Sequence, residues 1–177
     1  VSHTDPLDTL IMRRCTVSNC RNGAGFGAVH VSSPATLENC TLSGNYSILE
    51  QAGNAVHGSA KLIHCTVVNT NASSPFDGAE LANCLVTGHD VGQNPQDLGN
   101  TDSLGGNVTD TPFFSPLSSD LVFSRDGWFP SGLLPLAMNG GLVPTHALHL
   151  DSPAIDRGLK TFTSVTLPPK DARKHSR

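Results

Sequence analysis

The stretch NCTLSGN, residues 39–45, places a cysteine, a threonine and an aliphatic residue ahead of a Gly-Asn turn. Similar tetrapeptides return three more times, as RCTV at 14–17, HCTV at 64–67 and NCLV at 83–86. The cysteines are separated by 40 − 15 = 25, 65 − 40 = 25 and 84 − 65 = 19 residues. Recurrence of the same residues at intervals of this size is typical of a repeat architecture.

Aliphatic residues hold fixed positions around each cysteine. A cysteine and the residue two places on share one face of a strand, because strand side chains alternate. The aliphatic residue three places before the cysteine has the opposite parity, so the chain must bend between them. Asn39 and Asn83 suit that bend, since Asn tolerates the left-handed conformation. The residues at −3 are Met12, Leu37, Leu62 and Leu81, and those at +2 are Val17, Leu42, Val67 and Val86.

A coil of 19–25 residues with short strands and tight corners cannot bury its own apolar face, but it can when stacked on similar coils about 4.8 Å apart. The repeat therefore predicts an all-β parallel β-helix. No 3.6-residue periodicity points to helical repeats. One interior column should contain Cys15, Cys40, Cys65 and Cys84, with Val17, Leu42, Val67 and Val86 two residues on.

Cysteine suits such a column because it is small and readily buried. Disulfides would need Cβ atoms about 3.8 Å apart, closer than in-register stacking provides. A zinc site would need close pairs such as C-x₂-C, whereas these cysteines lie on separate coils. We therefore expect free, buried thiols, and Cys20, which has no counterpart in the other repeats, is also expected to be free.

Composition excludes several classes of function. Charged residues are 15% of the 177 residues, against roughly 25% in an average soluble domain. The net charge of −4 and the scattered cations offer no basic stripe for nucleic acid. No apolar run approaches the roughly 20 residues of a transmembrane helix. Since the chain opens with Val1 inside a repeat, we expect it to be a piece of a longer or processed polypeptide.

The repeat period fades after Cys84. We expect three segments: β-helix coils over 1–90, a loop-rich insertion over 91–127, and a terminal coil or cap over 128–177. Within the last segment, Asn139-Gly-Gly is a strong turn signal, and THAL and PAID each indicate a short strand. The apolar residues of this segment are expected to cover the open end of the helix, and they are Trp128, Phe129, Leu133, Leu136, Leu148 and Ile155.

The stretch LLPLAMNGGLVPTHALHLDSPAIDRG, followed by DARKHSR, resembles the C-terminal signature of the choice-of-anchor Q domain. The NCTLSGN and SLGGN elements are similar to the right-handed β-helix repeats of polymorphic outer-membrane proteins. The resemblance implies a right-handed helix in a secreted or surface-displayed bacterial protein, and it carries no catalytic residues. Two departures are visible, since DARKHSR lacks the glycine after arginine and Leu142 stands where proline is common.

Right-handed β-helices also include polysaccharide lyases and hydrolases, so acid–base chemistry must be sought. A glycosidase needs two carboxylates about 5–10 Å apart. The acids of the repeats show no matched pair between coils and no Ca²⁺-binding cluster, and they are Glu38, Glu50, Asp77, Glu80 and Asp90. We expect no catalytic residue, metal or cofactor. His146 and His149 should point to opposite faces of a strand, which argues against a metal site between them.

Four residues are weak candidates for glycan contact. His30 and His57 fall at similar points of successive coils and should stack on the exterior, where a general base would still need a partner. Trp128 and Tyr46 are the sole Trp and Tyr, and an aromatic platform suits a sugar ring.

The sequence thus favours a non-enzymatic secreted or cell-surface module with a stalk or adhesin-like role. Its expected partners are polysaccharides or neighbouring surface proteins. The alternative is a fragment of a carbohydrate-active β-helix enzyme, either a lyase or a glycoside hydrolase.

Overall fold

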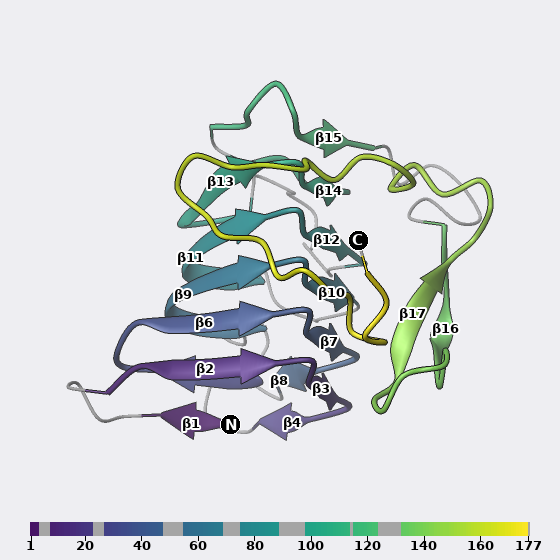
Figure 1. The fold of residues 1–177 in the computed structure, drawn as a ribbon. Helices are drawn as coiled ribbons and strands as arrows, with labels where there is room; N and C mark the ends of the chain where they lie inside the picture. Colours follow the sequence, from purple (N-terminus) through teal and green to yellow (C-terminus); the bar gives the residue numbers. More distant parts are fainter. Residues whose placement is uncertain are drawn as a thin grey trace.

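The computed structural model describes residues 1–3, 8–22, 27–47, 55–68, 75–88, 98–113, 115–123 and 132–176. Its regular structure is entirely β, and the strands stack as a parallel β-solenoid, as the repeat predicts (Figure 1). The first sheet contains β1 (Ser2–His3), β2 (Leu10–Arg13), β5 (Val29–Val31), β6 (Ala35–Glu38), β9 (Val56–Ile63), β11 (Phe76–Ala82) and β13 (Thr101–Gly105).

In each coil, a strand of the first sheet is followed by a corner and then by a strand of the second sheet. It contains β3 (Thr16–Ser18), β7 (Thr41–Ser43), β10 (Thr66–Val68), β12 (Leu85–Thr87), β14 (Val108–Thr109) and β15 (Leu121–Val122). A short third pair joins β4 (Arg21–Asn22) to β8 (Tyr46–Ser47). All of these pairs are parallel, because each strand meets the equivalent strand of the next coil.

One residue makes the corner between the first two sheets in each coil. It directly precedes the cysteine and adopts the left-handed conformation, with φ between 52 and 55°. The sequence predicts the left-handed conformation at Asn39 and Asn83. The structure shows it also at Arg14 and His64, which adopt it less readily than asparagine. In the next coil Gly106 takes the place, with φ of 68°. We call the side chains of this line the corner row, which comprises Arg14, Asn39, His64 and Asn83.

The interior is built from the inward faces of both large sheets. Cys40, Cys65 and Cys84 are at most 2% exposed, and the aliphatic residues two places after them are fully buried. Cys15 and Val17 are only half-buried. The reason is that β3 is the outermost strand of its sheet among the described residues, so they have a stacked neighbour on one side only.

Residues 98–123 extend the solenoid. This range lies within the segment expected to be a loop-rich insertion, yet its described residues supply β13, β14 and β15. Because Leu85 pairs with Val108, Asn107 occupies the next place in the cysteine column. Asn107 is fully buried, accepts a hydrogen bond from the Cys84 amide (2.9 Å) and donates one to the Leu81 carbonyl (3.0 Å).

Residues 132–176, which we call the clasp, lie along the side of the solenoid. They begin with an antiparallel hairpin of β16 (Leu133–Ala137) and β17 (Thr145–Leu148), and the remaining chain crosses the stacked coils (Figure 1). The expectation that the apolar residues of this segment cover the open end of the helix is therefore wrong. Leu148 and Ile155 are 41% and 40% exposed, while Trp128 and Phe129 lie outside the described residues.

The clasp takes this course because the side of the solenoid offers apolar and hydrogen-bonding partners. Ile63 and Ala82 point outward from the first sheet, and burial of such side chains requires a cover. Val165 of the clasp forms a small cluster with them, supported by Phe162 and Leu167.

Candidate binding site between the solenoid and the clasp

The corner row attaches the clasp to the solenoid. Asn83 bonds Leu159 twice, donating to its carbonyl (2.8 Å) and accepting from its amide (2.7 Å). Asn39 donates to the Lys170 carbonyl (2.9 Å). Asn39 is only 5% exposed and Asn83 is half-buried, so these two residues of the corner row lie beneath the clasp.

The second sheet faces the clasp with a line of outward side chains. Its members pair in register from coil to coil, and we call the line the outer row: Thr16, Thr41, Thr66, Leu85 and Val108. Thr16 donates a hydrogen bond to the Pro144 carbonyl (2.6 Å). Thr41 points outward from its strand, yet it is 4% exposed because the clasp covers it.

His146 on β17 completes the attachment at this side. Its Nδ1 lies 2.7 Å from the Leu134 carbonyl oxygen, which can only accept, so Nδ1 carries the proton. In the neutral ring Nε2 then accepts from the Ser43 hydroxyl at 2.9 Å. The ring therefore joins the hairpin to the second sheet.

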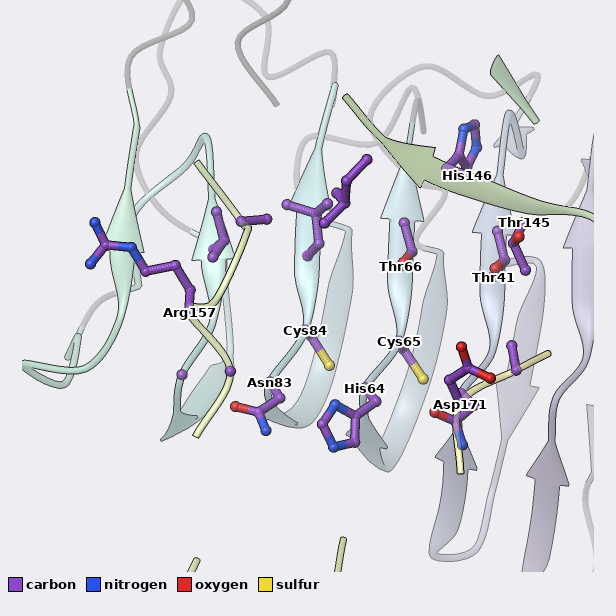
Figure 2. Close-up of a pocket in the computed structure, with 18 of the residues that line it drawn as sticks. Thr41, His64, Cys65, Thr66, Asn83, Cys84, Thr145, His146, Arg157 and Asp171 are labelled. Carbon is purple, nitrogen blue, oxygen red and sulfur yellow. The ribbon is translucent and has the colours of Figure 1, made fainter. Parts of the chain in front are cut away.

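A cavity of about 1160 Å³ remains between the solenoid and the clasp. Its floor is the corner row without Arg14 and the outer row without Thr16. Its walls are β17 and residues 154–160 and 167–173. In Figure 2, β17 crosses the strands that carry Thr41 and Thr66, with His64 and Asn83 at the corner beside them. The clasp is bonded at both ends of this space, near Thr16 and near Asn83.

Charged groups line the cavity on the clasp side. Arg157 and Lys160 have no ion-pair partner among the described residues, whereas the Asp171 carboxylate accepts from the Arg173 guanidinium at 3.0 Å. Burial raises the pKa of Asp171, but hydrogen bonds from the His175 amide and from Arg173, with the Arg173 charge, outweigh it and lower the pKa overall.

The cysteine column is a hydrogen-bonded structural element. Each buried thiol lies within reach of two backbone carbonyls, one in its own coil and one in the preceding coil; for Cys65 these belong to Ile63 (3.5 Å) and Leu37 (3.3 Å). All the cysteines are free, with Cys20 exposed. Hydrogen bonding to Cys65 and burial raise the pKa of Cys40, and burial raises that of Cys65 well above the ordinary value. The thiols of Cys40 and Cys65 are therefore protonated and unsuited to nucleophilic chemistry.

The three predicted glycan-contact residues that the structure describes do not form one site. His30 and His57 stack on the first sheet, with ring centroids 5.1 Å apart. Tyr46 lies on β8 of a different sheet, with the Arg21 guanidinium 5.0 Å from its ring centroid. Trp128 lies outside the described residues.

Outward acids on the first sheet pair with bases on neighbouring coils. Glu38 Oε2 lies 2.6 Å from Arg13 Nε, and Glu80 Oε2 lies 3.0 Å from Lys61 Nζ. Asp77 Oδ2 lies 3.3 Å from His57 Nδ1, which gives His57 the partner that a general base requires. Glu50 and Asp90 lie outside the described residues. Within the described ranges, no group of three or more His, Cys, Asp or Glu side chains could hold a metal ion.

Sequence reasoning missed the contribution of the clasp to this site. The recurrence of threonine after cysteine marks the outer row, but nothing local shows that a segment more than 100 residues away covers it. Arg157 and Lys160 likewise belong to the site only through the path of the clasp.

Stacked coils around one interior column, closed along one side by a C-terminal clasp, define a parallel β-helix repeat protein. Comparisons with protein-family models, with curated proteins and with solved structures find no match.

In the part of the chain that the structure describes, no helix has the length and apolar character needed to cross a membrane.

Proposed function

We propose that this chain is a non-enzymatic β-helix module of a secreted or bacterial cell-surface protein, with a stalk or adhesin-like role. The finer assignment is to the choice-of-anchor Q type, on the resemblance of its C-terminal signature. The observation that carries the proposal is the pairing of outward acids with bases from neighbouring coils, at Glu38, Asp77 and Glu80. Ion pairs between neighbouring strands stabilise the stack of coils. On the described surface these carboxylates contact bases, and no two of them come together as the acid pair that a glycosidase needs.

The roles of the signature residues support a structural module. Asn139 of the NGG turn donates to the Thr145 carbonyl (2.7 Å) and hydroxyl (3.2 Å), which closes the hairpin. Ser152 of SPAID accepts from the Ala154 amide at 3.3 Å and so shapes the next turn. These groups build the clasp, and the clasp braces the side of the solenoid.

The test is a screen of the purified protein against acidic and neutral polysaccharides, with and without Ca²⁺. We expect no release of unsaturated or reducing ends. Release that disappears in Glu38→Gln or Glu80→Gln would contradict the proposal, because a carboxylate would then be doing chemistry.

The alternative, a carbohydrate-active enzyme, is favoured by one contact. Asp77 can orient His57 as a base, and His30 lies beside it. If the same screen detects cleavage that is lost in His57→Ala and Asp77→Asn but kept in Glu80→Gln, the enzyme hypothesis replaces the structural one.

A further inference from the structure

We propose that the cavity between the outer row and the clasp binds a linear oligosaccharide that runs along the axis of the solenoid. This inference rests on the proposed function, since it names the ligand class that such a surface module would hold.

The shape of the cavity suits a chain molecule. Four successive coils line it in register through Thr41, Thr66, Leu85 and Val108. Because neighbouring strands lie about 4.8 Å apart, this line spans roughly 14 Å. The cavity is partly open to solvent, and its volume of about 1160 Å³ exceeds what a single small metabolite needs.

Two threonine side chains of the outer row line the floor of the cavity. The first member of the outer row, Thr16, reaches the Pro144 carbonyl and shows the direction of the line. Thr41 is 4% exposed and Thr66 is half-buried, and neither hydroxyl has a hydrogen-bond partner among the described residues. Both hydroxyls are therefore available to a ligand bearing hydroxyl groups, and a ligand that covered them without bonding them would lose free energy.

The row then becomes apolar. Leu85 and Val108 continue the floor, and Leu133 and Leu148 line the cavity from the hairpin. Sugar rings present both hydroxyl edges and C–H faces, so a chain of them matches a floor that passes from threonine to aliphatic side chains.

Other ligand classes fit less well. An extended peptide is recognised through a free strand edge, and the floor strands β7, β10 and β12 offer none, because each is paired on both sides. An acyl chain would leave the hydroxyls of Thr41 and Thr66 buried without partners. Nucleic acid is disfavoured by the net charge of −4.

Neutral and acidic oligosaccharides share the hydroxyl chemistry and differ at one group. Arg157 lines the cavity without an ion-pair partner among the described residues, so a sugar carboxylate would gain a contact there. Asp156, next to Arg157 in the chain, carries the opposite charge and would oppose that contact. Neutral and acidic oligosaccharides must therefore be compared by experiment.

The probes are neutral cello- and xylo-oligosaccharides and acidic uronate oligosaccharides of three to six rings, measured by titration calorimetry and saturation-transfer NMR. We expect at least one series to bind the whole protein with a Kd at or below about 1 mM. The double variant Thr41→Val, Thr66→Val keeps the side-chain shape and removes both hydroxyls. It should bind about tenfold more weakly or worse.

The matched control is Thr36→Val, which removes a hydroxyl from the outward face of the first sheet, away from the cavity, and should bind as the wild type does. Arg157→Gln should weaken acidic probes alone. If the double variant does not fold, as judged by its circular dichroism, the single Thr66→Val variant carries the test with a smaller loss.

Binding of none of the probes, or equal binding by the wild type and the threonine variant, would overturn the inference. Product analysis of the same samples separates it from the proposed function. Cleavage of a bound probe contradicts the non-enzymatic role, whereas absence of both binding and cleavage in the wild type contradicts the cavity assignment only.

Discussion

At the scale of single residues, a left-handed corner and a buried thiol define each repeat. The corner residue turns the chain between the two large sheets, and the buried thiol that follows lies within hydrogen-bonding reach of carbonyls in two coils. The corner row also attaches the clasp, because the side-chain amides of Asn39 and Asn83 donate hydrogen bonds to it. Both tasks meet at Asn83.

Asn83→Ala should lower the free energy of unfolding by about 2–4 kcal/mol, since it places a Cβ residue without a polar side chain in the left-handed region and removes two hydrogen bonds. Asn83→Gly removes the same bonds but tolerates the backbone, so it should cost about 1 kcal/mol less than Asn83→Ala. Urea unfolding measures both. Equal stability of Asn83→Ala and the wild type would refute the role of this corner.

The buried thiols make stability depend on alkaline pH. The pKa of Cys65 is raised in the folded state, so the folded state favours the protonated thiol, and this contribution is complete below the unfolded pKa. As pH rises past the ordinary value of 9.0, unfolding releases a proton and stability falls. We expect the free energy of unfolding to decline from about pH 9 upward.

Cys65→Ala should flatten that decline, while Cys20→Ala, at an exposed thiol, should leave it unchanged. Denaturant melts between pH 7 and pH 10.5 provide the comparison. A decline that is identical in the wild type and Cys65→Ala would show that another group is responsible.

At the scale of elements, the local sequence pattern predicts the coils of the solenoid but not the clasp that covers their side. The cysteine spacing and the positions of Leu37 and Leu42 predict the strand–corner–strand unit. They can do so because that unit depends on residues only a few places apart in the chain. The path of the clasp depends on contacts between Asn39 and Lys170, which are 131 residues apart in the chain. The exposed fraction of Thr41 therefore could not be read from its neighbours.

The apolar contact between the clasp and the first sheet gives a prediction at this scale. Phe162→Ala should lower the free energy of unfolding by about 1–2 kcal/mol, because a half-buried ring leaves the cluster on Ile63 and Ala82. Thr163→Ala, at the exposed neighbouring position, should change it by less than about 0.5 kcal/mol. Thermal melts of the two variants side by side check this, and equal effects would place the clasp elsewhere.

At the scale of the whole molecule, two layers of structure have different origins. The solenoid is a one-dimensional stack in which each coil contacts its neighbours. The clasp adds contacts across several coils at once, through Pro144 with Thr16, Leu159 with Asn83 and Lys170 with Asn39. The clasp thereby connects coils that are not neighbours in the stack and that a bare solenoid would leave without direct contact. It also encloses the cavity.

The most direct test of this account is the rate of thiol alkylation in the native protein, resolved for each cysteine by peptide mass spectrometry. Cys20 should react fast, Cys15 more slowly, and Cys40, Cys65 and Cys84 only after unfolding, because their sulfurs lie in one buried column. Rapid native alkylation of Cys65, or a disulfide between Cys40 and Cys65, would contradict the register of the entire solenoid.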